Sequence, residues 1–530
     1  MRISTSQFYE ATTSNYQRNY SNMIKTGEEV SSGIKLNTAS DNPVGASRVL
    51  QLAQQNSMLT QYSSNIGTIN TNTTNSETAL SSIIDAMQTA QELIVKAGNG
   101  SYTDKDRIST ADELKQLQSQ ILGLMNSQDS NGQYMFSGSK SSIPPYSQNA
   151  DGTYSYNGDQ THVNLAVGDG LVLASNTTGF EAFEQAVNTS RTSATLTSPA
   201  VEDGKVSLTG GLVKSSNAYN NNYQAGEPYT LTFLSSTQFK ITDGSGNDVT
   251  ADASTAGNFT HGSFNDQSFT FRGVELTMNV NLTAAERATT AAADAVLTNR
   301  TYQLASTPDS VTTSRSPGNP STANISSSVV GTSAADLTAF NNTFPTTGAI
   351  LKFTSATNYE LYASPVTSSS TPVSTGTLTG TTANAAGVNF TISGTPANGD
   401  QFVVQSSTHQ TENVLNTLSA AIKALTTPTD GNLVASQNLD SALSSALGNI
   451  ISSMEQASTA RSAGGARQVA ATAQGVTNDL LKGNNEVEQG TFVNSDMVEA
   501  TTRLTLQKTM LDASQAVFVQ LSKLNLFSQI

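Results

Sequence analysis

Apolar residues recur at alternating spacings of four and three near both ends of the chain, whereas short alternating runs occupy the middle. The first such stretch runs from Tyr9 to Ile34 and predicts a helix with one apolar seam, weakened at Thr13 and Gly27. An aromatic stripe on that helix suits either core packing against the C-terminal helix or a subunit interface, and the two are compatible. The seam consists of Tyr9, Thr13, Tyr16, Tyr20, Met23, Gly27, Val30 and Ile34.

A second and longer seam runs from Leu52 to Ala97 and predicts a helix of roughly 70 Å at about 1.5 Å per residue. A helix of that length belongs in a coiled coil or an elongated bundle rather than in a globular core. Asp41 and Asn42 can cap its start, with Pro43 in the first turn.

A third helix is predicted to follow, with Asp104 as its cap. Its apolar face consists of Ile108, Ala111, Leu114, Leu117, Ile121 and Leu124.

The C-terminal end mirrors this arrangement with three further helical stretches. Residues 414–425 predict one helix, and another begins near Leu439. In the last stretch, helical spacing is kept by Leu506, Met510, Ala513, Val517, Leu521 and Leu524. The terminal helices have few apolar neighbours in sequence. Two alternatives follow: the helices form an antiparallel pair that closes one domain, or each of them also packs against further copies of the chain.

The middle of the chain, from Gly132 to about Thr408, is rich in Ser, Thr, Gly and Asn and predicts short strands. A duplication is visible, because LTFLSSTQFKI at 231–241 aligns with LKFTSATNYEL at 351–361. FTFRG at 269–273 then aligns with FTISG at 390–394. We interpret this as two tandem β units, joined by a flexible or extended linker at 307–328.

The predicted fold class is α+β, with an elongated, discontinuous helical bundle or coiled coil built from both termini and β-rich domains inserted into it. Four domains are expected. They are a terminal coiled-coil assembly domain (1–40 with 490–530), a helical bundle with a small β region (41–190 with 410–489), a first β unit (191–306), and a linker with a second β unit (307–409).

Composition excludes several kinds of chemistry. The chain has 530 residues, no Cys and a net charge of -15, which argues against thiolate sites and against duplex nucleic acid as a partner. His162, His261 and His409 lack metal-ligand spacing, and the loop 243–252, with its three Asp residues, fits a polar turn better than a calcium site. We therefore predict no catalytic residue, no metal and no cofactor. An absent apolar run at the N-terminus, taken alone, favours the cytoplasm, and we expect no membrane-spanning segment.

Three segments resemble the flagellin superfamily. SSGIKLNTASDNPVGASRV at 31–49 is similar to the link between its first two helices, and NGQYMFSGSKSSIPPY at 131–146 to the turn after its third. Arg461 and Gly465 to Arg467 resemble a pattern in its penultimate helix. The opening MRIST, the run ELIVKAGNGSYTDKDR and the ending LNLFSQI are closer to its hook–filament junction proteins than to filament flagellins.

The resemblance implies a structural role without enzymatic activity: export by the flagellar type III apparatus, an extracellular location, and terminal helices that fold on assembly. It implies self-association into a ring, with the first hook-associated junction protein and flagellin as neighbours. The interface residues that we predict from the seams are Tyr9, Tyr16, Tyr20, Met23, Val30, Ile34, Leu506, Met510, Val517, Leu521 and Leu524. An export chaperone is expected on Leu506, Met510, Val517 and Leu521.

Two other functions stay open at this point. The chain could be the filament flagellin or a minor flagellin, which differs from a junction protein in copy number. Alternatively, the doubled β insert could be an adhesive or enzymatic module, for which Phe239 and Tyr359 are candidate ligand-binding aromatics, although their equivalent places in both repeats favour core packing.

Overall fold

The computed structural model describes residues 5–149, 152–261, 266–331, 333–344, 348–364, 366, 369–407 and 409–526. The side chains of Tyr9, Leu521 and Leu524 lie outside the described residues. Contacts divide the chain into a terminal unit (1–71, 164–175 and 466–530) and a body unit (72–163 and 176–465). The four-domain division expected from the sequence stays a prediction.

Six long helices are formed where the seams predicted them. Their bounds are α1 (Thr5–Ser32), α2 (Pro43–Ala97), α3 (Asp104–Met125), α7 (Val414–Thr426), α8 (Leu433–Val493) and α9 (Met497–Leu526).

The ends of α1 and α2 follow from local chemistry. Gly33 has a φ of +73° and ends α1, so Ile34 lies beyond the helix and forms a β-bridge with Asn494 instead of continuing the seam. Asn42 caps α2, because its Oδ1 accepts a hydrogen bond from the Gly45 amide at 2.9 Å, with Pro43 as the first helical residue.

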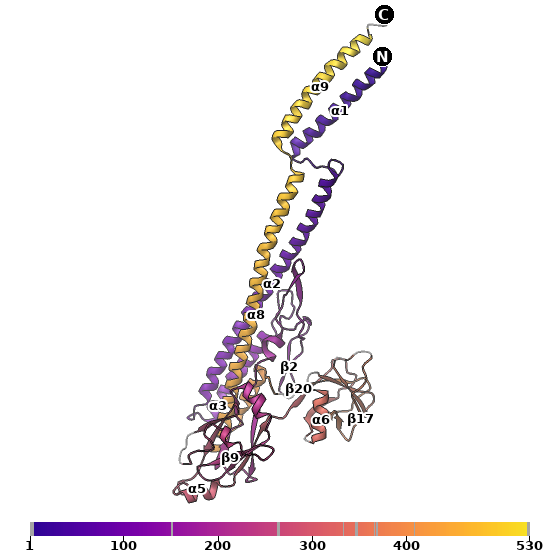
Figure 1. Ribbon diagram of the computed structural model, residues 1–530. Helices are drawn as coiled ribbons and strands as arrows, with labels where there is room; N and C mark the ends of the chain where they lie inside the picture. The colour runs from indigo at the N-terminus through magenta and orange to yellow at the C-terminus, as the bar shows by residue number, and fades with distance from the viewer. Residues whose placement is uncertain are drawn as a thin grey trace. The chain divides into compact units, whose positions relative to one another are not determined.

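In the terminal unit, α1 and α9 form an antiparallel pair (Figure 1). The parts of α2 and α8 in this unit also run side by side, with the hairpin β3 (Asn164–Gly168) and β4 (Leu171–Ala174) against them. The Asn478 side chain donates to the Val167 carbonyl at 2.8 Å, and Asn65 donates to that of Ala166 at 2.7 Å. A small apolar cluster completes this contact: Ile66, Ile69, Val167 and Ala471.

The body unit has a continuous helical core made by α2, α3, α7 and α8. On α7 the large apolar residues that face this core are all buried: Val414, Leu415, Leu418, Ile422 and Leu425. On α3, Ala111, Leu114 and Ile121 are buried as predicted, but Ile108 is 45% exposed. Arg107, the residue before Ile108, is buried instead. The side of α3 that faces the core is therefore polar in the first turn.

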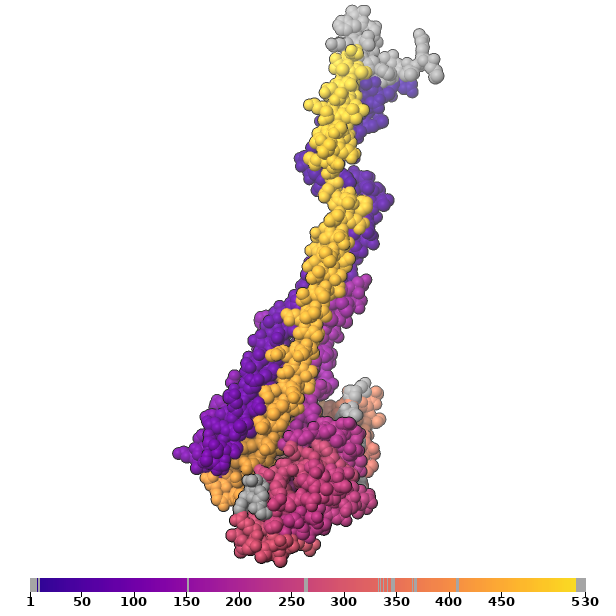
Figure 2. Space-filling model, turned by 60° about the vertical axis from the view of Figure 1, so that its left-hand side comes forward, coloured from indigo at the N-terminus to yellow at the C-terminus, as the bar shows by residue number. Residues whose placement is uncertain are grey.

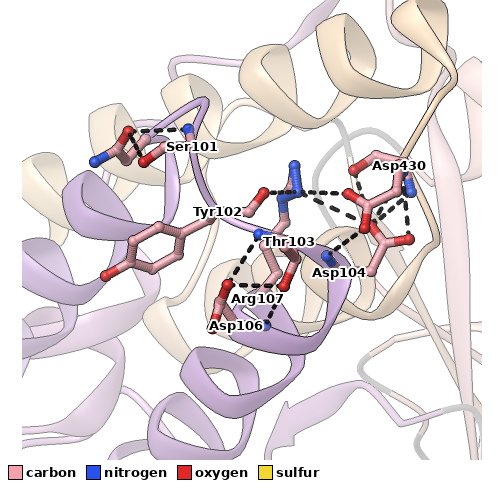
Figure 3. A network of polar contacts seen from close by, with 9 residues as sticks. Ser101, Tyr102, Thr103, Asp104, Asp106, Arg107 and Asp430 are labelled. Atoms are coloured by element: carbon pink, nitrogen blue, oxygen red, sulfur yellow. Dashed lines mark hydrogen bonds and ion pairs between the residues drawn. The ribbon is translucent and has the colours of Figure 1, made fainter.

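A polar network fixes the start of α3 to the loop between α7 and α8 (Figure 3). The helix is capped by Thr103, which forms a capping box with Asp106; the predicted cap, Asp104, lies one residue inside the helix. Asp104 instead accepts the amide hydrogens of Thr429 and Asp430 at 2.8 and 3.2 Å. The amide hydrogen bond from Thr429 is the main reason why the pKa of Asp104 is lowered.

Arg107 completes the network. Its guanidinium donates to the Tyr102 carbonyl at 2.7 Å and lies 3.6 Å from Asp430 and 3.9 Å from Asp104. The side chain therefore neutralises two carboxylates from different parts of the chain.

The small β region between α3 and the first β unit contains the hairpin β1 (Tyr146–Gln148) and β2 (Tyr154–Tyr156) and the short π-helical turn η1 (Phe180–Glu184). Phe136 and Tyr146 each pack edge-on against Phe183, and all three join the helical core.

The first β unit has two sheets, with strand orders β5-β12-β8-β9 and β10-β11-β6, to which β7 adds by pairing with β11. The strands are β5 (Thr192–Ser198), β6 (Val206–Leu208), β7 (Leu212–Val213), β8 (Tyr229–Phe233), β9 (Phe239–Thr242), β10 (Gln267–Phe271), β11 (Val274–Val280) and β12 (Thr301–Ser306). Its short helical segments are α4 (Ser216–Ala218), η2 (Tyr219–Tyr223), η3 (Thr250–Asp252) and α5 (Thr290–Leu297).

The second β unit has sheets β13-β20-β15-β16-β17 and β14-β19-β18. The strands are β13 (Ser310–Arg315), β14 (Asn324–Val330), β15 (Ala349–Phe353), β16 (Asn358–Ala363), β17 (Ser374–Thr377), β18 (Thr382–Ala385), β19 (Val388–Ser393) and β20 (Gln401–Ser407), with helix α6 (Ala334–Thr343) between β14 and β15.

The two β units share one strand order, with β5, β12, β8 and β9 equivalent to β13, β20, β15 and β16. The duplicated segment falls on equivalent hairpins: Leu231 opposes Ile241 in the first, and Leu351 opposes Leu361 in the second. The other sheets correspond as β10-β11-β6 and β18-β19-β14. Each contains a two-residue hairpin turn with both residues at positive φ, 272–273 in the first unit and 386–387 in the second.

Two expectations for this region are wrong. FTFRG and FTISG are not equivalent, because the first lies on β10 and its turn, whereas the second lies on β19 and the residue after it. The expected linker 307–328 contains β13 and most of β14, and each of these strands lies at the edge of a sheet. Edge strands need few apolar anchors, and here Val311 and Ile325 are buried among Ser and Thr, which concealed both strands in the sequence.

Replacing Arg107 with Met should lower the free energy of unfolding of the body unit by about 1–3 kcal/mol, because it removes a buried cation and leaves its partners without a donor. Urea unfolding followed by circular dichroism measures this. Lys115→Met is the matched control on the same helix, since its ion pair with Asp112 is exposed and should contribute under about 0.5 kcal/mol. Equal effects of the two substitutions would contradict the role given to Arg107.

Candidate assembly surface on the terminal helices

The contact between α1 and α9 uses one side of each helix. Tyr16 packs against Phe518 with ring centroids 6.5 Å apart, and the Asn19 side chain donates to Ser514 Oγ at 3.1 Å. At the other end of the pair, Glu29 binds both Arg503 and the Ser495 hydroxyl. On α9 the residues toward this side are buried or half-buried, and they keep four-three spacing: Ala500, Leu504, Gln507, Leu511, Ser514 and Phe518.

A second apolar seam on α9 is exposed. Leu506, Met510 and Val517 are 55%, 49% and 46% exposed, and Ala513 between them is exposed as well. Because this seam is offset by one or two residues from the contact side, it lies on a different face of the helix. Figure 2 shows α9 in yellow beside the indigo α1, with the outer side of α9 uncovered in that view. The sequence seam thus marks the outer face of α9, and the contact to α1 is made by another set of residues.

On α1 the predicted residues divide between the two sides. Tyr16, Met23 and Val30 are half-buried, on the side that carries the contacts to α9. Tyr20 stacks on Tyr16 with ring centroids 6.3 Å apart but is 48% exposed, and Ile24 one turn on is exposed too. Their use as a subunit interface stays a prediction, as does that of Ile34 beyond the helix end.

The part of α8 in the terminal unit carries another exposed seam, whose residues are not among the predicted interface residues. It consists of Val469, Ala473, Val476, Leu480, Gly483 and Val487, and the four large members of this set are exposed. The contacts of α8 with α2 use other residues: Glu488 binds Arg48 at 2.7 Å, and Asn485 donates to Asn56 at 3.1 Å. The four-three spacing of the exposed set is present in the sequence and could have revealed it. The Gly and Ala residues in the seam weakened the signal.

The terminal unit therefore exposes more large apolar side chains than it buries. Apart from the cluster around Ile66, its buried apolar residues among those described are Leu52, Ala500 and Leu511. The exposed set includes Leu50, Val44 and Met58 on α2 as well as the seams on α8 and α9. Extended apolar seams on an otherwise polar surface are typical of interaction surfaces.

Other kinds of site can be checked among the described residues. They contain no cluster of three or more His, Asp or Glu side chains placed to hold a metal ion, and none of the described helices combines the length and hydropathy of a membrane span. In the loop 243–252, Asp243 accepts the amide hydrogens of Ser245 and Asn247 at 3.0 and 2.8 Å, so this carboxylate closes its own turn. Phe239 and Tyr359 are buried in the cores of the two β units and cannot contact a ligand.

The chain is similar to known proteins of the bacterial flagellum. Residues 3–141 match the family described as the bacterial flagellin N-terminal helical region. The chain is 35% identical over 183 residues to flagellar hook-associated protein 3 of Salmonella typhimurium, covering 34% of this chain and 57% of that protein. It is 34% identical over 148 residues to the protein of the same name in Escherichia coli, covering 28% and 47%. The chain thus spans about half the length of these curated relatives.

Among solved structures, the chain is similar to flagellar hook associated protein-3 from Legionella pneumophila. The identity is 18%, and the match covers 90% of this chain and 99% of that one with a TM-score of 0.47.

Leu511→Ala should loosen the pairing of α1 with α9, whereas Met510→Ala, one residue away, should not. Leu511 is 5% exposed at the contact, so its truncation should cost about 2 kcal/mol, or roughly a thirtyfold loss of hydrogen-exchange protection in both helices. Exchange measured by mass spectrometry on the dilute chain tests this. Similar losses in both variants would contradict the assignment of the two faces.

Proposed function

We propose that this chain is a structural subunit of the bacterial flagellum and forms the junction between hook and filament. The observation that carries the proposal is the pair of seams on α9, one against α1 and one exposed, in a chain similar to flagellar hook-associated protein 3. On this proposal the chain associates with itself into a ring, next to the first junction protein on one side and flagellin on the other. It works as an interface and catalyses no reaction.

The energetics support association through the exposed faces. Ordering a helical residue costs roughly 1–2 kcal/mol, and a two-helix contact with few buried apolar residues offsets little of that. Full burial of each large side chain in the outer seam of α9 would contribute about 1.5–3 kcal/mol. Neighbouring copies that cover Leu506, Met510 and Val517 would therefore stabilise α1 and α9 together.

The same outer seam supports the proposed binding of an export chaperone before assembly. A groove that binds a helix contacts apolar residues spaced one or two turns apart on one helix face. Leu506, Met510 and Val517 have this spacing. Chaperone and neighbouring subunit would then compete for one surface, so the chaperone would also prevent early assembly. Leu521 belongs to the same proposal. Export through the flagellar type III apparatus to the cell exterior is part of it as well.

Filament flagellin is the second candidate, favoured by the match of residues 3–141 to the flagellin N-terminal region. Deleting the gene distinguishes the two. If the chain is the junction protein, electron microscopy will show hooks without filaments and the medium will contain unpolymerised flagellin. Bare hooks without flagellin in the medium would identify the chain as the filament subunit, and normal filaments would exclude both.

The double substitution Leu506→Ser and Met510→Ser should abolish assembly without changing the body unit, since both side chains are exposed in the single chain. In the deletion strain it should fail to restore filaments, although the purified variant keeps its thermal unfolding of the body unit. Lys508→Gln, also exposed on α9 between the two positions, is the matched control and should restore them. Restored filaments with the double variant would contradict the proposed interface.

A further inference from the structure

The exposed seam on α8 contains a glycine that the packing of the chain itself does not require. Gly483 lies inside the helix, its φ is not positive, and a Cβ at this position would meet no atom within 4 Å. Glycine inside a helix destabilises it relative to alanine, because glycine loses more backbone entropy on folding. The gap above Gly483 is therefore room for a side chain that another helix supplies.

The outer seam of α9 matches this part of α8 in spacing and in size. Both seams have successive spacings of four, three and four residues, and each combines three large side chains with one small residue. The positions on α8 are Val476, Leu480, Gly483 and Val487, and those on α9 are Leu506, Met510, Ala513 and Val517. All eight residues are exposed, so neither seam is covered within the chain.

The sizes of the residues select the direction in which the two seams can pair. Parallel pairing would place Gly483 opposite Ala513 and leave a void between two small residues. Antiparallel pairing places Gly483 opposite Met510 and Leu480 opposite Ala513, so each small residue receives a large side chain. The two outer layers are then Val487 with Leu506 and Val476 with Val517.

The charged residues on the two segments fit the same antiparallel order. In this register Glu486 lies within one residue of the level of Lys508, and Lys482 lies within one residue of the level of Asp512. Asp479, the remaining charged residue of the two segments, comes level with a serine. Opposite charges therefore meet at two levels, and like charges do not meet.

The contacts around the loop between α8 and α9 favour a second copy of the chain as the source of the covering helix. The Lys35 amide donates to the Val493 carbonyl at 2.8 Å, and the Ser495 amide donates to the Gly33 carbonyl at 2.9 Å. Folding α9 back on its own α8 would have to open these contacts, whereas a second copy leaves them in place. Because one chain carries both seams, a two-fold arrangement brings each seam onto its complement twice.

We propose that the free chain forms an antiparallel, two-fold dimer in which the α8 seam of each copy covers the outer α9 seam of the other. The outer seam of α9 is also the surface through which assembly is proposed, so the dimer holds the chain back from assembly until it dissociates. The dimer concerns the free chain and does not depend on the proposed function. A monomeric chain would exclude the dimer and leave the gene-deletion test unaffected.

Sedimentation velocity of the purified full chain, from low to high micromolar concentration, tests the dimer. The dimer fraction should rise with concentration, and Gly483→Gln, which fills the gap, should weaken dimerisation about tenfold or more. Gly67→Gln on α2 is the matched control, because a Cβ there also meets no atom within 4 Å, and it should leave dimerisation unchanged. A monomer at every concentration, or equally strong dimers of both variants, would overturn the proposal.

Cysteine pairs test the register and show which chain supplies the covering helix. The chain has no Cys of its own, so oxidation of the variant with Leu480→Cys and Ala513→Cys should join two chains, seen as a dimer on a non-reducing gel. Leu480→Cys with Leu506→Cys, displaced by about 10 Å along α9, is the control and should not crosslink. A disulfide within one chain would show that α9 folds back on its own α8. That result, or equal crosslinking of the control, overturns the proposal.

Discussion

Two antiparallel helices share one contact, so a helix with apolar residues on two sides leaves one side in water unless a third element covers it. This constraint governs the terminal unit. On α9, Leu504, Leu511 and Phe518 follow the side toward α1, while Leu506, Met510 and Val517 lie outside it. The part of α8 in this unit repeats the arrangement, with polar ties to α2 on one side and Val469 to Val487 on another. These exposed seams are the surfaces on which the proposed association with other molecules rests.

The body unit meets the same constraint within one chain. Here α3 and α7 cover the sides of α2 and α8 that are open elsewhere, and their apolar residues form one core. Buried polar side chains then fix how the parts join. Gln118 on α3 donates to the Leu415 carbonyl and Ser419 of α7 at 2.8 Å, and Arg107 holds the next loop. Asn449 holds the root of the first β unit by bonds to residues 188–190. Such hydrogen bonds add little net stability, but a buried polar group left without its partner is costly. They therefore mainly fix the register and orientation of the parts they join.

Much of the helical architecture could be predicted because heptad spacing reports a helix and its length directly. Spacing alone does not show which seam faces which partner: the predicted interface residues on α9 lie outside the contact with α1, and α8 carries an equally regular seam that is weakened by Gly and Ala. The strands of the β units were harder to predict from the sequence. The hairpins at 231–241 and 351–361 were visible because apolar alternation and turn residues repeat there. In contrast, β13 and β14 each carry one buried anchor among Ser and Thr, which a single sequence does not distinguish from an extended linker.

Arg191 touches both ends of the second β unit. Its carbonyl accepts the Thr307 amide at 2.9 Å, and its guanidinium donates to the Gln410 carbonyl at 3.2 Å. A module whose entry and exit lie within reach of one side chain can be gained, lost or exchanged by a single recombination event without moving the scaffold that carries it. The shared strand order of the two units is what such an event leaves behind when the inserted module is a copy of its neighbour. The β insert is therefore free to diversify by copying whole modules, while the terminal helices, through which assembly is proposed, remain constrained by the fit of their apolar seams.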